Sequence, residues 1–205
     1  VDKFTVSYNL WGGAQWPGAS IDPDKNILYV TSHDLPTKFK VFSSFDINKN
    51  LEFETNVLNI GKNNKLDDLE GYPGIKPPWG SLTALNLNSG KIIWQVPLGY
   101  FDELKNRGLK DTGTANFGGA TATAGNLVFA GGTLDKLIRA FDSESGEVLW
   151  SYKLPYIGSA PPTVYEVNGE QFVIIPATGG MSLARIYPDL VEQGDAFVAF
   201  KLKKN

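Results

Sequence analysis

Hydrophobic and polar residues alternate along most of this chain, in short runs that have the length of β-strands. The clearest runs are residues 82–87, 91–96, 127–130, 137–141 and 148–154. Alternation with a period of two is typical of strands that bury one face. Turn-forming sequences rich in Gly, Asn, Asp and Pro separate the runs, which predicts antiparallel hairpins. The pattern therefore predicts an all-β fold.

Two hairpins share one sequence pattern, and the rest of the chain is organised around them. One is Ala140-Phe-Asp-Ser-Glu-Ser-Gly-Glu-Val-Leu-Trp150, and the other is Ala84-Leu-Asn-Leu-Asn-Ser-Gly-Lys-Ile-Ile-Trp94. The Gly of each turn can adopt a positive φ without steric cost. A recurring hairpin that ends on Trp indicates a β-propeller of four-stranded blades. In such a fold, the Trp can pack flat between neighbouring sheets and bury a large apolar area.

The strand pattern also indicates how many blades the chain holds. Residues 120–154 contain one complete set of four strands, residues 162–175 repeat its first two, and residues 196–202 add a third. We therefore expect about three four-stranded antiparallel blades, the last without its outer strand. A propeller typically needs four to eight blades. The chain is thus expected to be part of a longer precursor, to complete its ring with another chain, or to self-associate.

The start of the chain and one long segment bear on this organisation. Because Val1 is not Met, we expect it to be an internal position of a longer precursor, with a processed start after signal removal as the alternative. Residues 32–79 have a weaker pattern and are predicted to be a long inserted excursion within the first blade, with candidate strands at 39–45 and 51–58. Long loops in compact domains are usually functional or mobile. A short helix is expected at residues 101–107.

Composition and single residues exclude several kinds of chemistry. The net charge of −3 gives no electrostatic case for binding nucleic acid, and zero Cys excludes a thiolate metal site. No apolar run approaches the roughly 18 residues of a membrane span. His33, the only histidine, is expected to be a solvated loop residue rather than a base. Asp67, Asp68 and Glu70 could hold calcium through hard oxygens, but a solvated acidic loop is the favoured interpretation.

With these motifs in view, the chain resembles the quinoprotein dehydrogenases, which use pyrroloquinoline quinone (PQQ), and in particular the C-terminal part of their glucose-dehydrogenase-like branch. The two Trp hairpins are similar to the tryptophan-docking motif of that family. An ordered series of further motifs is similar too: Trp16-Pro-Gly-Ala-Ser-Ile-Asp-Pro, Ile27-Leu-Tyr-Val, Pro78-Trp-Gly-Ser-Leu-Thr-Ala-Leu, Gly113-Thr-Ala-Asn-Phe-Gly-Gly, Thr123-Ala-Gly-Asn-Leu-Val-Phe and Gly194-Asp-Ala-Phe-Val-Ala-Phe.

The resemblance implies an eight-bladed propeller in the periplasm, of which residues 1–205 would be the C-terminal portion of a single domain. It implies a PQQ cofactor near the propeller axis with a divalent ion, expected to be calcium. The family's catalytic Asp, its cofactor-contacting Lys and its metal ligands lie upstream of Val1. No catalytic or metal-binding residue is therefore predicted in this chain.

Three positions match cofactor-facing places of the family, and each departs from its usual residue. Thr31 stands where relatives usually carry Asn, Phe117 where alcohol-oxidising relatives place Trp, and Met181 where relatives carry Trp or His. Thr can donate one hydrogen bond to a quinone oxygen. Phe can stack on a ring, and Met can pack softly against one. With the adjoining Gly118, these residues are the predicted cofactor-binding set: Thr31, Phe117, Gly118 and Met181.

The leading hypothesis for function is a segment of a PQQ-dependent dehydrogenase that oxidises an alcohol or an aldose sugar and contributes one wall of the quinone site. The alternative is a non-catalytic propeller scaffold or interaction module, which the three departures favour. Such a module would self-associate or complete its ring with another chain.

Overall fold

The computed structural model describes residues 5–7, 12–43, 56–59 and 65–202 of the chain. The chain divides into two compact units, one formed by residues 1–13 and 34–76 and the other by residues 14–33 and 77–205. Within the described residues, no helix is long and apolar enough to cross a membrane. Antiparallel sheets dominate both units, which confirms the prediction of an all-β fold.

The first unit holds a small three-stranded sheet in the order β1-β5-β6. Its strands are β1 (Thr5–Ser7), β5 (Thr37–Ser43) and β6 (Asn56–Asn59). The sequence predicts strands at 39–45 and 51–58, so β5 and β6 agree in place with shorter or shifted bounds. Residues 44–45 and 51–55 of those predictions lie outside the described residues.

The second unit begins with a sheet in which the central strand β4 has partners on both edges. β7 pairs along one edge of β4, while β2 and β3 share the other edge, and β8 pairs with β7. This sheet consists of β2 (Gly13–Ala14), β3 (Ser20–Asp22), β4 (Ile27–His33), β7 (Gly80–Asn86) and β8 (Lys91–Pro97). Residues 34–79 connect β4 to β7. The short strand β2 was not predicted from the sequence pattern.

The second sheet of this unit has four strands in the order β12-β11-β10-β9. They are β9 (Ala120–Ala122), β10 (Leu127–Ala130), β11 (Leu137–Asp142) and β12 (Val148–Lys153). The bounds of all four strands lie within one or two residues of those predicted from the sequence. The sheet is a complete up-and-down blade, with each strand antiparallel to the next along the chain.

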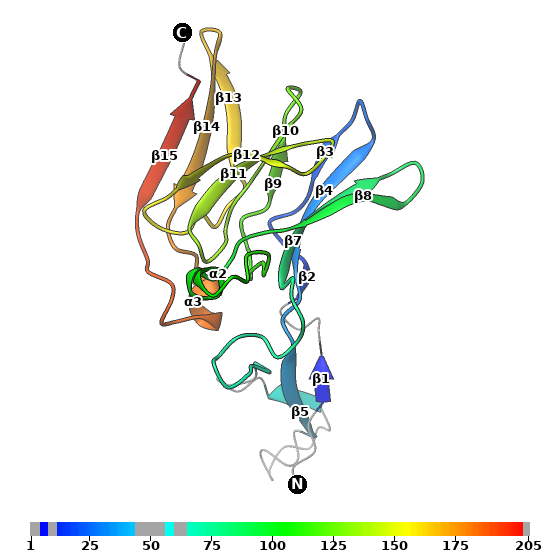
Figure 1. Ribbon diagram of the computed structural model, residues 1–205, viewed down its shortest axis with the longest axis vertical. Coiled ribbons are helices and arrows are strands. Elements are labelled where there is room, and N and C mark those ends of the chain that lie inside the picture. The colour runs from blue at the N-terminus through cyan, green and yellow to red at the C-terminus, as the bar shows by residue number, and fades with distance from the viewer. Residues whose placement is uncertain (1–4, 8–11, 44–55, 60–64, 203–205) are drawn as a thin grey trace. The chain divides into compact units, whose positions relative to one another are not determined.

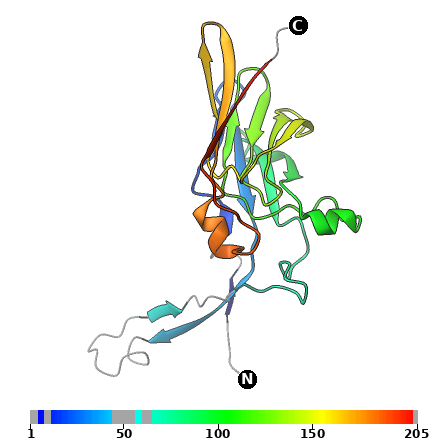
Figure 2. The ribbon, with the colours of Figure 1, turned by 90° about the vertical axis from the view of Figure 1, so that its left-hand side faces the viewer.

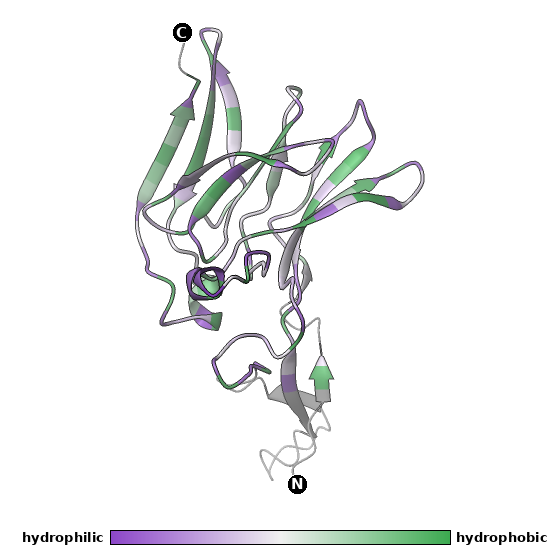
Figure 3. Cartoon of the chain, viewed as in Figure 1, coloured by the Kyte–Doolittle hydropathy of each residue, from purple (hydrophilic) through white to green (hydrophobic). Residues whose placement is uncertain are grey.

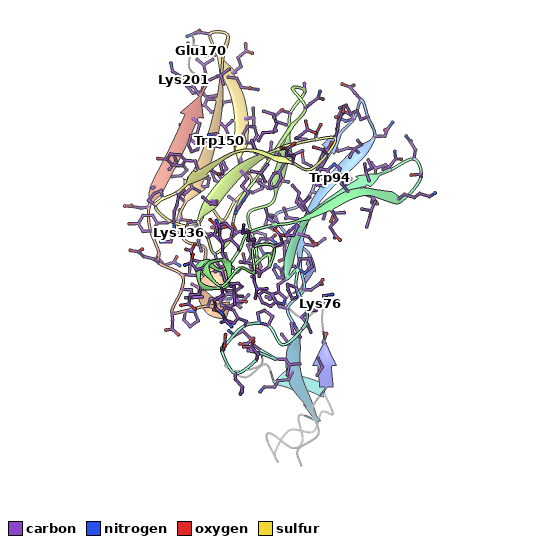
Figure 4. All side chains as sticks on the ribbon, viewed as in Figure 1. Lys76, Trp94, Lys136, Trp150, Glu170 and Lys201 are labelled. Carbon is purple, nitrogen blue, oxygen red and sulfur yellow. The ribbon has the colours of Figure 1, made fainter. Side chains whose placement is uncertain are left out.

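The third sheet has three strands in the order β13-β14-β15. They are β13 (Thr163–Val167), β14 (Glu170–Ala177) and β15 (Ala196–Lys201). No fourth strand pairs with β15 among the described residues, in agreement with the predicted lack of an outer strand. An ion pair of 3.4 Å between Lys201 Nζ and Glu170 Oε2 joins the C-terminal end of β15 to the N-terminal end of β14 (Figure 4).

Connections at the two ends of these three sheets differ in kind. Tight turns close one end, after β3, β7, β9, β11 and β13, whereas long connections with the helices α2 (Asp102–Asn106) and α3 (Met181–Ile186) occupy the other. Figures 1 and 2 show both helices at the end opposite the tight turns. We call these the hairpin end and the loop end. α2 agrees with the predicted helix at 101–107, while α3 was not predicted.

Two hydrophobic cores fill the spaces between the three sheets, and the second sheet contributes to both. Val128, Ala130 and Phe141 belong to the core shared with the first sheet. Phe129, Ile138 and Ala140 belong to the core shared with the third. Figure 3 shows hydrophobic residues along the strands and hydrophilic ones at several hairpin turns. The strands β10 and β11 of the second sheet are therefore buried on both faces, whereas its outer strand β12 is exposed.

The two Trp hairpins have the same local geometry. In β7–β8, Ala84 is opposite Trp94, and the register shifts by one residue directly after Ala84; in β11–β12, Ala140 is opposite Trp150, with the same shift. A bulge of this kind re-aims the side chains of a strand. Because directly opposed residues share one face of an antiparallel sheet, the small Ala leaves room for the indole. The sequence spacing from Ala to Trp is thus explained by the bulge.

Candidate functional site

The predicted cofactor-binding residues all come from the loop end of the second unit. Thr31 is near the end of β4, Phe117 and Gly118 are in the connection from α2 to β9, and Met181 begins α3. Antiparallel strands bring these separate segments to the same end of the sheets. Nothing in the structure tests whether the four residues bind a cofactor, so their role stays a prediction.

Thr31 is fully buried, with an exposed fraction of 0 %. Its Oγ1 has no hydrogen-bond partner within the described part of the chain. A buried hydroxyl without a partner costs about 1–3 kcal/mol, so a ligand oxygen would satisfy a group that is otherwise unpaired. This orphaned donor fits the predicted bond from Thr31 to a quinone oxygen.

His33 is not the solvated loop residue that the sequence suggests. β4 continues to His33, which pairs with Gly80 of β7, and the side chain is only 1 % exposed. Its Nδ1 lies 3.2 Å from the backbone N of Asn116 and 3.0 Å from the carbonyl oxygen of Asn116. The expectation was wrong because β4 extends as far as His33, and alternation along β4 turns His33 inward with Thr31.

Asn116 is a second buried residue at this place that the sequence interpretation did not single out. Its Nδ2 donates to the carbonyl oxygen of Ser32 at 2.8 Å, while its Oδ1 has no partner in the residues that the structure describes. The only available signal was its position directly before Phe117 in a Gly-rich loop. Asn116 and His33 thus join that loop to the end of β4.

Phe117 is 4 % exposed, and its ring meets the ring of His33 edge-on, with centroids 5.0 Å apart and planes at 64°. The backbone N–H of Phe117 donates to the carbonyl oxygen of Gly132 at 3.2 Å. The chain's own residues therefore enclose most of the ring. Any contact with a ligand would use the small part that remains uncovered.

Gly118 has a packing reason for lacking a side chain. A Cβ built on it would lie 2.5 Å from the carbonyl carbon of Gly131 and 2.7 Å from the nitrogen of Gly132. Real Cβ atoms do not approach backbone so closely. The neighbouring backbone explains this glycine without a ligand, although its assignment to the cofactor site is not tested.

Met181 is the first residue of α3, and it is 68 % exposed. Its Sδ accepts a hydrogen bond from Nη2 of Arg185 at 3.6 Å. Leu183 and Ile186, three residues apart, are the buried residues of this helix. That spacing was the one signal in the sequence for α3. Met181 therefore offers an exposed apolar side chain at the loop end.

The acidic residues of the first unit are engaged in local contacts. Asp68 Oδ1 accepts hydrogen bonds from the backbone N–H groups of Glu70 and Tyr72, and Asp67 pairs with Lys65 at 3.0 Å. The favoured interpretation of these residues, a solvated acidic loop, is consistent with those contacts. No group of three or more His, Cys, Asp or Glu suited to a metal ion occurs among the described residues.

Comparisons with known proteins show which family and which relatives this chain is similar to. The sequence profile of the PQQ glucose/ethanol/alcohol dehydrogenase β-propeller domain matches residues 3–173. The quinate/shikimate dehydrogenase (quinone) of Acinetobacter baylyi is 30 % identical over 94 % of this chain and 26 % of its own length. The quinoprotein glucose dehydrogenase of Escherichia coli is 28 % identical over 93 % of this chain and 26 % of its own length.

A solved structure agrees with the architecture. The quinohemoprotein alcohol dehydrogenase of Comamonas testosteroni superposes with a TM-score of 0.61 at 23 % identity, over 87 % of this chain and 24 % of that one. With the profile match, it confirms the predicted β-propeller fold. The chain spans about a quarter of the length of the curated relatives that it matches. It belongs to the family of PQQ-dependent glucose/ethanol/alcohol dehydrogenases, as part of their β-propeller domain.

Proposed function

We propose that this chain supplies one wall of the quinone site in a PQQ-dependent dehydrogenase that oxidises an alcohol or a sugar. The observation that carries the proposal is the buried, unpartnered Oγ1 of Thr31 at the loop end of a chain that belongs to this family. Quinate, glucose and alcohol dehydrogenases are all among the similar proteins. Quinate, glucose and alcohols all carry hydroxyl groups, so we propose a hydroxyl-bearing substrate.

The roles of the chain's own residues follow from their chemistry. The hydroxyl of Thr31 can donate a hydrogen bond to a quinone oxygen, and Met181 can lie against a flat ring. When bound, PQQ would supply the two-electron acceptor for the hydride that leaves the substrate carbon while the substrate hydroxyl gives up its proton. No residue of this chain is proposed as the base for that proton. We propose that calcium and the base belong to residues outside this chain and that the enzyme acts in the periplasm.

We further propose that the blade ring continues beyond the first sheet and that the Trp hairpins dock consecutive blades, as in the family's tryptophan-docking motif. Trp94 supports this proposal, because its Nε1 donates to the carbonyl oxygen of Ser143 in the next sheet at 3.1 Å. The corresponding turn of the first sheet, at Gly90, has no described atom within 4 Å of a Cβ built there. A Trp from a preceding blade would fit that place.

The proposal can be tested by titrating PQQ, with calcium present, into the protein as its source produces it. Thr31→Val removes the hydroxyl and keeps the shape of the side chain. We expect it to weaken PQQ binding about tenfold, which corresponds to about 1.4 kcal/mol. We also expect the stability of the quinone-free protein to stay level or rise, because an unpaired buried polar group is lost.

Thr163→Val is the matched control, because Thr163 is an exposed residue of β13. It should leave both PQQ binding and stability unchanged. Absence of PQQ binding by the unaltered protein would overturn the proposal and favour the non-catalytic scaffold. Equal PQQ affinity in Thr31→Val and the unaltered protein would remove Thr31 from the site. Reduction of a dye with sugars, quinate or alcohols as substrates would then identify the substrate class.

A further inference from the structure

A buried polar junction joins the end of β4 to the loop of residues 113–119. His33 ends β4, and Asn116 lies in the loop directly before Phe117. Both side chains are buried, with exposed fractions of 1 % for His33 and 0 % for Asn116. Buried polar groups are ordinarily retained where their hydrogen bonds fix one arrangement of the chain. The junction is therefore expected to hold the loop in one arrangement against β4.

The contacts of His33 Nδ1 depend on a single proton. As an acceptor, Nδ1 takes the hydrogen bond from the backbone N–H of Asn116, at 3.2 Å. As a donor, it would instead address the carbonyl oxygen of Asn116, at 3.0 Å. A ring nitrogen can do one or the other, never both. Either way, the imidazole holds the backbone of Asn116 at a fixed distance from β4.

Asn116 adds further links at the same point. Its Nδ2 donates to the carbonyl oxygen of Ser32 at 2.8 Å, so the side chain binds back to β4. On the other side, Asn116 forms an isolated antiparallel bridge with Thr133, in the connection between β10 and β11. The residue is therefore held between the loop ends of the first and second sheets.

The residue that this junction carries is Phe117. The ring of His33 meets it edge-on at 5.0 Å, and its backbone N–H is bound to Gly132. Since only 4 % of Phe117 is exposed, the surface that it can offer to a ligand depends closely on where the loop lies. Displacements of about 1 Å in a binding site can cost up to about 100-fold in rate.

We propose that His33 and Asn116 are positioning residues, which fix Phe117 and its loop in the place required for quinone binding. The proposal rests on the proposed function of the loop end as a quinone wall. His33 acts through Asn116 and Phe117, and no contact of its own with the quinone is required. This role is separate from that of Thr31, which would contact the cofactor directly.

A matched pair of variants separates the two properties of the imidazole. His33→Phe keeps an aromatic ring beside Phe117 but removes the nitrogen that contacts Asn116. His33→Asn removes the ring but places an amide oxygen where it can accept the N–H of Asn116. We expect PQQ affinity in the protein as its source produces it to fall about tenfold in His33→Phe. In His33→Asn, affinity should stay within about twofold.

Two readouts besides affinity make the test specific. At saturating PQQ, we expect the absorption band of the bound quinone to move toward that of free PQQ in His33→Phe, and to stay in place in His33→Asn. In the quinone-free protein, amide hydrogen exchange of residues 113–119 should become at least about tenfold faster in His33→Phe only. Exchange elsewhere in β4 should not change.

The outcomes distinguish the inference from the proposed function. If the unaltered protein binds no PQQ but His33→Phe still loosens residues 113–119, the proposed function fails and the positioning role stands. If PQQ binds normally to the unaltered protein and equally to His33→Phe, the positioning role is overturned while the proposed function stands. A parallel loss of affinity and global stability in both variants, with the absorption band unmoved, would show a merely structural histidine and also overturn the inference.

Discussion

The two Trp hairpins have nearly the same sequence and the same bulge, yet their surroundings differ. Trp94 is docked on the second sheet, where Ser143 accepts its Nε1–H at 3.1 Å and also accepts the hydroxyl of Tyr29 at 3.2 Å. Trp150 is 38 % exposed, and its Nε1 has no acceptor among the described residues. Its ring packs against the rings of Phe200 and Tyr152.

The glycines of the two turns also differ in what lies beside them. A Cβ built on Gly146 would lie 2.8 Å from Cε3 of Trp94, whereas one built on Gly90 meets no described atom within 4 Å. Gly146 of the second hairpin therefore receives Trp94 of the first, whereas Gly90 has no Trp beside it among the described residues. The difference shows that one local sequence can have different contacts: Trp94 packs on the next sheet and donates a hydrogen bond to it, whereas Trp150 packs on the next sheet through ring contacts alone.

Substitution of the docked Trp should have the largest effect on stability. Trp94→Ala removes a large aromatic side chain from a packed interface and leaves Ser143 with one donor fewer. We expect it to lower the free energy of unfolding by about 3–5 kcal/mol. Trp150→Ala should cost about 1–2 kcal/mol, because its ring is more exposed than the partly buried ring of Trp94. Chemical denaturation of both variants tests the difference, and equal losses would contradict it.

The Gly substitutions sharpen the comparison by probing what covers each turn. Both glycines have a positive φ, of 75° at Gly146 and 67° at Gly90, so Ala at either costs about 1 kcal/mol in backbone strain. Gly146→Ala also forces a Cβ into Trp94, and we expect a total of about 2–4 kcal/mol.

If the ring continues as proposed, Gly90→Ala should cost as much as Gly146→Ala in the protein as its source produces it. Thermal unfolding of both variants measures this. A loss of only about 1 kcal/mol for Gly90→Ala would show that no further blade covers the first hairpin. That result would contradict the proposed ring.

The smallest expected effect concerns pH. Hydrogen bonds from the backbone N–H and then the hydroxyl of Ser145 hold the pKa of Asp142 below its usual value. A carboxylate with a lowered pKa stabilises the fold above its unfolded pKa, and this contribution is lost as pH falls through its folded pKa. Asn86, its counterpart in the first hairpin, makes two similar bonds with an amide oxygen that does not titrate.

Acidification below about pH 4 should therefore open the turn at residues 143–146 more than the turn at 87–90. Amide hydrogen exchange of the two turns, corrected for the intrinsic pH dependence of exchange, measures the difference. Asp142→Asn should abolish it. Equal opening of both turns in acid would refute the assigned role of Asp142.

Local patterns predicted the sheets well, because their causes are local. Alternation and turn residues placed the strands of the second sheet within one or two residues, and the spacing from Ala to Trp marked both hairpins. α2 was found for the same reason, with acidic residues in its first turn. α3 was missed because the helix is short, has only Leu183 and Ile186 as buried residues, and follows two glycines.

The candidate site was less predictable, because its contacts join residues far apart in the sequence. His33 looked like a solvated loop residue, since its strand partner Gly80 follows only after the long connection of residues 34–79. Its contact with Asn116 depends on the packing of the first sheet against the loop before β9. No periodicity in the sequence reports such a contact. Thr31, Phe117 and Met181 were chosen by resemblance to the family.

The central claim, that Thr31 faces the quinone at the loop end, is tested most directly by the structure of the PQQ-loaded protein. The measurement is the distance from Thr31 Oγ1 to the nearest quinone oxygen. We predict a hydrogen bond of about 2.5–3.0 Å, the range of O–H···O bonds. A quinone bound beyond the reach of Thr31, or bound at the hairpin end, would contradict the account.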